Sequence, residues 1–171
     1  MAMLETRVDG LALDVTTNSP VVILSPLKLD KVLPIWIGHT EAWAIAMELS
    51  AIPSKRPMTH DLIRMIITAL SAEVERVEIT ALREQTFYAR VLLKTNGTSL
   101  SIDSRPSDSI ALALKAKAPI FVEESLFHLG EGSLEMSDSE ENQKPPFSNN
   151  PESLKDRLKR INPEDFGKYS L

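Results

Sequence analysis

The polar side chains best suited to chemistry in this 171-residue chain lie where strand-like segments give way to helix-like ones: Glu41, Arg56, His60, Asp61, Arg105 and Asp108. Paired carboxylates hold hard divalent cations through oxygen ligands. Glu41 and Asp108 therefore predict a metal site for Mg²⁺ or Mn²⁺. A metal held there activates water and neutralises a phosphodiester, so the pattern predicts a hydrolytic reaction on a phosphate-bearing substrate.

The other four residues supply the remaining parts of that chemistry as catalytic candidates. Arg56 or Arg105 steadies the charge that develops on a phosphodiester, and His60 transfers a proton. Asp61, which follows His60 in the sequence, is the fourth catalytic candidate.

A purely structural role also explains these residues. An acid in the first turn of a helix is stabilised by free N–H groups and the macrodipole, by about 0.3 to 1 kcal/mol. Arg56-Pro57 and Arg105-Pro106 hold the backbone extended before a helix begins. The alternative function is therefore a non-enzymatic, homo-oligomeric binding or regulatory module whose polar motifs are structural.

The segments that position these residues occur twice. Arg7–Asp14 resembles Arg76–Arg83 at an offset of 69 residues, and Thr40–Met47 resembles Ser107–Leu114 at an offset of 67. A hairpin is predicted within each copy, and Asn96-Gly97 suits a type I′ turn in the second. We infer a duplicated strand, hairpin and helix unit, with a closing strand over Pro119–Glu123.

The helices of the two copies are apolar on nearly all sides, so each is expected to be covered by a curved sheet or by a subunit interface. An inserted segment, Thr59–Ala72, has the pattern of an ordinary amphipathic helix. Its apolar face comprises Leu62, Met65, Ile66, Ala69 and Leu70. The fold class is therefore α+β, with a mixed, largely antiparallel curved sheet.

Composition divides the chain into three parts. Residues 1–130 form the folded domain, residues 131–150 an acidic flexible linker, and residues 151–171 a short C-terminal helix with a tail. The helix is predicted from apolar residues at 154, 158 and 161. Alone it is marginal, so it is expected to dock on the domain or on a partner.

Charge and composition exclude several classes of function. The net charge is -5, and residues 1–130 alone hold 13 Lys and Arg against 15 Asp and Glu, so a strongly basic nucleic-acid surface is absent. There is no cysteine, which excludes thiolate zinc sites and cysteine nucleophiles. No apolar run is long enough to span a bilayer and no signal peptide is evident, which predicts a cytoplasmic protein without membrane contact.

Several motifs together resemble the bifunctional nuclease (BFN) domain family in its bacterial form: Leu33–Gly38, Arg56–Leu62, Thr86–Ala89, Arg105–Leu114 and Ala118–Val122. The resemblance covers roughly residues 4 to 130, and Asn162–Phe166 is similar to the short tail of bacterial members. It implies an α+β domain with a mixed sheet and a nuclease, a hydrolase acting as RNase, DNase or both. It supplies no catalytic residues, so the site prediction rests on the positions named above.

The sequence also predicts self-association. Two nearly all-apolar helices and open strand edges indicate a homo-oligomer, and we expect a homodimer.

Overall fold

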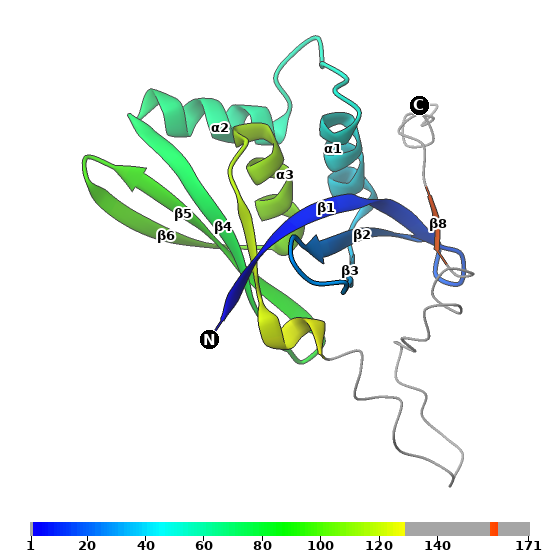
Figure 1. Cartoon of the computed structure of the whole chain (residues 1–171). Coiled ribbons are helices and arrows are strands. Elements are labelled where there is room, and N and C mark those ends of the chain that lie inside the picture. Colours follow the sequence, from blue (N-terminus) through cyan, green and yellow to red (C-terminus); the bar gives the residue numbers. More distant parts are fainter. Residues whose placement is uncertain (1, 129–157, 161–171) are drawn as a thin grey trace, which may run out of the picture.

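One mixed sheet organises the molecule, with its helices together on one side (Figure 1). The computed structural model describes residues 2–128 and the backbone of residues 158–160. The sheet order is β3-β2-β1-β7-β4-β5-β6, with β8 paired to β1. The strands are β1 Met3–Asp14, β2 Ser19–Pro26, β3 Leu33–Trp36, β4 Ala72–Arg83, β5 Thr86–Thr95, β6 Thr98–Ser104, β7 Ile120–Glu123 and β8 Leu158–Arg160.

The sheet confirms the α+β class and the repeated order of elements. Strands β1-β2-β3 and β4-β5-β6 form two antiparallel meanders on either side of β7. Strand β7 runs antiparallel to β1 and parallel to β4, which makes the sheet mixed. Asn96 and Gly97 both have positive φ, as the predicted type I′ turn requires. Register shifts in β1 and β4 mark bulges, which bend the two long strands.

Helices α1 (His39–Leu49) and α3 (Pro106–Ala116) form the centre of the core, as their all-round apolar sequences predict. The buried residues include Ile45 of α1 and Ile110 of α3, which pack with strand residues such as Val22, Val77 and Ile79. The sheet and the neighbouring helices therefore cover them within one chain.

Helix α2 (Thr59–Ala69) differs, since its one buried residue is His60. Most of the predicted apolar face of this helix is exposed, notably Leu62, Met65, Ile66 and Leu70. The amphipathic pattern correctly predicts the helix, but the expected burial of its apolar face does not occur within the described part of the chain.

Residues 158–160 form strand β8, whereas the sequence predicts helix there. Strand β7 covers only residues 3–6 of one edge of β1, and β8 pairs with Ala12–Asp14 farther along that edge. Free backbone groups on β1 therefore offer partners that a short helix of marginal stability lacks. The prediction is wrong over these three residues, and the remainder of the predicted helix and the linker lie outside the described residues.

Within the described ranges, no helix has both the length and the apolar character needed to cross a membrane.

Candidate functional site

The first turns of all three α-helices meet at one ionic cluster. Glu41 lies in the first turn of α1, His60 in that of α2 and Asp108 in that of α3, while Arg105 immediately precedes α3. We call Glu41, His60, Arg105 and Asp108 the helix-start cluster. Four of the six residues predicted from sequence are thus brought together, from segments up to 67 positions apart.

Arg105 joins the two carboxylates of this cluster. Its Nε donates to Asp108 Oδ2 at 2.8 Å and its Nη2 donates to Glu41 Oε1 at 2.7 Å. These bonds raise the pKa of Arg105, the bond to Asp108 first and the bond to Glu41 next. Its side chain is 66% exposed, so the guanidinium faces solvent while it holds both acids.

His60 lies behind Arg105 in the protein interior. Its Nε2 is 3.0 Å from Asp108 Oδ1, and its side chain is only 9% exposed. Asp108 therefore has one oxygen on an exposed cation and the other on a buried imidazole. The carboxylate fixes the ring orientation and leaves Nδ1 as the nitrogen available for proton transfer.

Asp108 is held as a carboxylate. Burial is the largest effect on its pKa and opposes ionisation, but the hydrogen bonds from Arg105 and His60, with their charges, together outweigh burial. The pKa of Asp108 consequently lies below its ordinary value.

Gly38 makes room for the Glu41 carboxylate. A Cβ built on Gly38 would overlap with Oε2 of Glu41. The φ of Gly38 is -75°, so its backbone is ordinary and space, rather than conformation, demands glycine here. A larger residue would therefore force the Glu41 carboxylate to shift.

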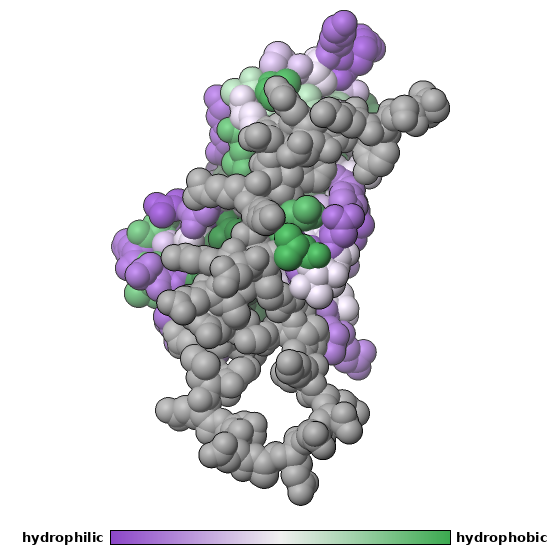
Figure 2. Space-filling model, turned by 90° about the vertical axis from the view of Figure 1, so that its right-hand side faces the viewer, coloured by the Kyte–Doolittle hydropathy of each residue, from purple (hydrophilic) through white to green (hydrophobic). Residues whose placement is uncertain are grey.

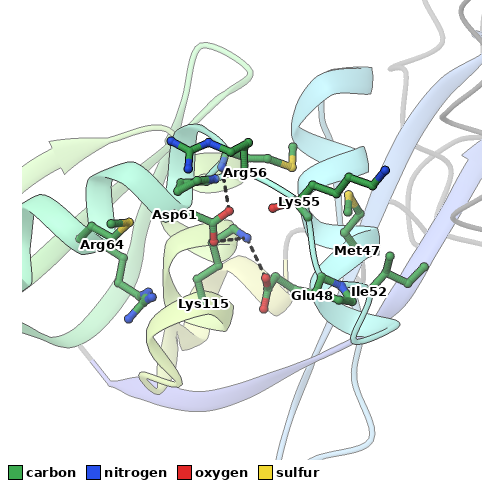
Figure 3. Close-up of a pocket in the computed structure, with 13 residues that line it drawn as sticks. Met47, Glu48, Ile52, Lys55, Arg56, Asp61, Arg64 and Lys115 are labelled. Carbon is green, nitrogen blue, oxygen red and sulfur yellow. Dashed lines mark hydrogen bonds and ion pairs between the residues drawn. The ribbon is translucent and has the colours of Figure 1, made fainter.

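Asp61 points away from the helix-start cluster and joins a second network. One oxygen accepts from the backbone N–H of Met58 at 2.9 Å, which closes the start of α2. The other is 2.8 Å from Nζ of Lys115, and this amine also donates to Glu48 at 2.7 Å (Figure 3). We call Glu48, Asp61 and Lys115 the helix-end network, because Glu48 and Lys115 lie near the ends of α1 and α3.

Burial shapes both pKa values in this network. The Lys115 side chain is 6% exposed; burial lowers its pKa, but the bonds to Asp61 and Glu48 outweigh burial and raise it overall. Burial likewise raises the pKa of Asp61, yet Lys115 and the Met58 N–H lower it further than burial raises it. Both groups are therefore charged in the folded state.

The helix-end network lines a pocket of about 370 Å³ whose rim carries three further cations, Lys55, Arg56 and Arg64. In Figure 3 the side chains of Asp61, Glu48 and Lys115 face one another, while those of Lys55 and Arg64 extend away from them. The six charged residues of this pocket give four positive charges against two negative ones. The pocket is consequently cationic in an acidic protein.

Arg56 therefore lines a different pocket from the one beside Arg105. Asp108 and Lys115 are seven residues apart on α3, which corresponds to about 10 Å along a helix. The structure therefore does not bring Arg56 or the Asp61 carboxylate to the helix-start cluster.

A second pocket, of about 360 Å³, adjoins Arg105. Its walls combine apolar and polar side chains, among them Trp36, Phe87, Gln85 and Ser107. Trp36 is fixed by donating from Nε1 to Asp14 at 2.9 Å. This pocket offers space beside the exposed guanidinium.

The residues do not form a ready-made metal cage. Glu41 and Asp108 both accept hydrogen bonds from Arg105, so a guanidinium lies where the sequence predicts a cation. In the described part of the chain no group of three or more His, Cys, Asp or Glu side chains is arranged to hold a metal ion. The use of Mg²⁺ or Mn²⁺ stays a prediction.

Sequence reasoning missed Lys115 and Glu48. One signal was available, because the 67-residue offset that relates Glu41 to Asp108 also relates Glu48 to Lys115. Equivalent positions meet between the two helices, and an acid opposite a lysine predicts an ion pair. The cations Lys55 and Arg64 carried no comparable signal, since neither belongs to a repeated motif.

The fold and the clusters define an α+β domain with two ionic networks between its helices. Comparison with known proteins makes this class specific, because the model of the bifunctional nuclease domain matches residues 9–133. The chain belongs to the bifunctional nuclease domain family.

Its relatives differ in how much of the chain they share. An uncharacterized protein of Mycobacterium tuberculosis is 40% identical over 164 residues, which cover 95% of this chain and 97% of that protein. Bifunctional nuclease 1 of Oryza sativa subsp. japonica is 29% identical over 96 residues, 54% of this chain and 29% of the plant protein. Bifunctional nuclease 1 of Arabidopsis thaliana is 26% identical over 97 residues, which cover 55% of this chain and 30% of the plant protein.

Proposed function

We propose that this protein is a nuclease that hydrolyses phosphodiester bonds of RNA, DNA or both at the helix-start cluster. Family membership supports the activity, and the observation that supports the place is Arg105. This guanidinium is exposed, is held in position by two carboxylates, and has an Asp–His pair directly behind it.

In this proposal Arg105 binds the phosphate. Its Nε and Nη2 hold Asp108 and Glu41, while Nη1 makes no bond within the described residues and is available to a phosphate oxygen. A guanidinium fixed on two sides loses little conformational freedom when it binds an anion. The adjoining pocket at Trp36 and Phe87 receives the nucleoside attached to that phosphate.

His60 acts as the proton donor. With a neutral imidazole, the helix-start cluster has two negative charges against one positive charge and repels a phosphodiester. Protonation of His60 makes the cluster neutral, with Nε2–H bound to Asp108 and Nδ1–H available to the leaving oxygen. Water then bonds to phosphorus and releases its proton to solvent, while the bond to the leaving oxygen breaks and that oxygen takes the proton of His60.

The cationic pocket contributes affinity. Lys55, Arg56 and Arg64 are at its rim, and Lys115 within it is already paired with two carboxylates. Phosphates of the strand beyond the reacting one are expected to contact these three rim cations. Each contact increases the affinity for nucleic acid by an amount that depends on salt concentration and not on base sequence.

The test is cleavage of fluorescent single- and double-stranded RNA and DNA by wild type, Arg105→Gln and an Asp108→Asn/Glu41→Gln double variant. Each is assayed with Mg²⁺, Mn²⁺ or EDTA, which also tests the predicted metal dependence. The matched control is Arg7→Gln, since Arg7 likewise forms an exposed pair with a carboxylate, Asp9, but lies on β1.

Cleavage that both cluster variants lose and Arg7→Gln retains would support the proposal. Equal cleavage by all four proteins would identify a contaminating nuclease, and absence of cleavage by wild type would refute the proposal.

The second candidate function is a non-enzymatic binding or regulatory module. The observation that favours it is the mutual pairing of the polar residues: Arg105 satisfies Glu41 and Asp108, and Asp61 accepts from a backbone N–H and from Lys115. Under this alternative, Asp108→Asn lowers stability while nucleic-acid binding, measured by fluorescence anisotropy, is unchanged. Under the nuclease proposal the same substitution abolishes cleavage in a protein that is still folded.

A further inference from the structure

Large apolar side chains are exposed both along α2 and on β6. Three on α2 and one directly after it are about half exposed or more: Leu62 at 52%, Met65 at 48%, Ile66 at 50% and Leu70 at 71%. Leu100 and Ile102 of β6 are exposed at 46% and 48%. Contiguous apolar areas of this kind on a folded domain mark interaction sites.

The two β6 side chains project from the helix-bearing face of the sheet. In the β5–β6 register Leu100 is opposite Leu93 and Ile102 is opposite Val91, and directly opposed residues share a face. Leu93 and Val91 belong to the hydrophobic core. Leu100 and Ile102 therefore extend the core face beyond the part that the helices of this chain cover.

Strand β6 is also a free edge. Among the described residues it pairs only with β5 and is the last strand on its side of the sheet. Natural sheets protect such edges with proline, lysine or short strands. The opposite edge, β3, has four residues including Pro34, whereas β6 has seven residues and neither proline nor lysine.

Figure 2 views the side of the molecule on which β8 lies. Among the residues drawn in colour in Figure 2, hydrophilic groups predominate and the hydrophobic ones form small separate areas. Strand β8 anchors residues 158–160 on β1, and three strands separate β1 from β6. The chain is therefore attached to the sheet far from the exposed edge.

We propose that a second copy of this chain pairs with β6 in antiparallel orientation about a two-fold axis at Ser101. The strand is self-complementary in this register, because Leu100 lies opposite Ile102 of its copy. Ser99 then lies opposite Asp103, so the one charged residue of β6 meets a neutral one. The pairing satisfies the free backbone groups and joins two sheets into one, with the apolar sides of both α2 helices on the same face.

This interface does not depend on the nuclease activity. Of the two grounds on which the sequence predicts self-association, the apolar helices do not carry it, since α1 and α3 are covered within one chain, whereas an open strand edge does. The free edge and the exposed side of α2 carry the inference.

Single cysteines test the register directly, because the chain has none of its own. Opposed residues in antiparallel strands have Cα atoms about 4.5 to 5.5 Å apart, within disulfide range. Ser101→Cys is therefore expected to form a covalent dimer on mild oxidation. Ser99→Cys is the matched control on the same strand: its counterpart is four residues farther along, about 13 Å away, and few covalent dimers should form.

Light scattering tests the association itself. Wild type is expected at twice 19.0 kDa at micromolar concentration, and Ile102→Lys at 19.0 kDa. Val32→Lys is the control, since Val32 is 50% exposed and precedes β3, at the opposite edge of the sheet from β6. Circular dichroism establishes that Ile102→Lys is folded.

A wild-type mass of one chain would overturn the proposal. A dimer that survives Ile102→Lys, or that forms equal covalent yields from Ser101→Cys and Ser99→Cys, would place the interface elsewhere and overturn it as well.

Discussion

Replacement of the buried Lys115 by methionine is expected to destabilise the domain strongly. Lys115 is 6% exposed, while its partners Glu48 and Asp61 are 31% and 23% exposed. Methionine retains most of the aliphatic stem, so little cavity forms and the loss is electrostatic. Removing one partner of a fully buried ion pair costs about 3 to 5 kcal/mol. Because water reaches both carboxylates in part, we expect about 2 to 3 kcal/mol in the free energy of unfolding at pH 7.

The pH dependence of this loss separates charge from packing. In wild type the pKa of Asp61 is lowered, so its contribution is present above the unfolded-state pKa and is lost as pH falls through the folded-state pKa. Without Lys115 the pKa of Asp61 is higher than in wild type, because only the Met58 N–H and the charge of Arg64 then oppose burial. The variant therefore takes up a proton at higher pH and loses less stability on acidification. The difference between wild type and Lys115→Met should shrink as pH falls from 7 to about 3, below the ordinary aspartate pKa of about 3.9.

Urea unfolding at both pH values measures this difference, with Lys94→Met as an exposed control expected within about 0.5 kcal/mol of wild type. An equal loss at pH 7 and at about pH 3 would refute the electrostatic account.

Four further outcomes follow from the geometry. Gly38→Ala should push the Glu41 carboxylate from its place beside Arg105. Because the guanidinium is exposed, the expected loss in the free energy of unfolding is less than about 1 kcal/mol. A double-mutant cycle with Glu41→Gln should be non-additive. Asp108→Asn should lower stability by roughly 1 to 2 kcal/mol at pH 7, and this difference should disappear as pH falls through the lowered pKa of Asp108, as urea titrations at several pH values would show. Arg105→Gln leaves two carboxylates without their counter-charge, so Mg²⁺ or Mn²⁺ should raise the Tm of this variant more than that of wild type; equal shifts would contradict the prediction. Asn96→Ala should lower Tm by a few degrees, because alanine disfavours the left-handed φ of 46° at the hairpin turn.

The repeat explains why so much of the fold could be predicted from sequence. Turn residues such as Asn96-Gly97 and the alternating apolar segments determine hairpins locally, and the two offsets identify the equivalent elements. Patterns of this kind do not say which surface an amphipathic helix meets. The exposed side of α2 was therefore beyond sequence reasoning, because its pattern reports an apolar face and not the molecule that covers it. Strand β8 was missed for a related reason, since the free edge of β1 exists only in the assembled sheet.

The candidate site could be predicted in its positions but not in its pairings. Glu41 and Asp108 are equivalent in the repeat, which correctly suggests that they approach one another. Which cation lies between them depends on side-chain reach in the folded protein, and Arg105 is the group that extends between them. Arg56 has the same Arg-Pro context in the sequence, yet it precedes α2 and lines the other pocket.

The duplication also accounts for the presence of two networks. Helices α1 and α3 lie side by side and in the same direction, because equivalent residues meet at both their starts and their ends. At the helix ends, the two equivalent positions carry Glu48 and Lys115, whose opposite charges form an ion pair. At the starts both copies keep an acid, so two carboxylates close together require a cation between them. Arg105 supplies that charge from within the chain, and its guanidinium stays exposed while it bonds both acids. Under the nuclease proposal this guanidinium is the group that a phosphate meets first, whereas under the alternative it is a structural counter-charge to the two acids.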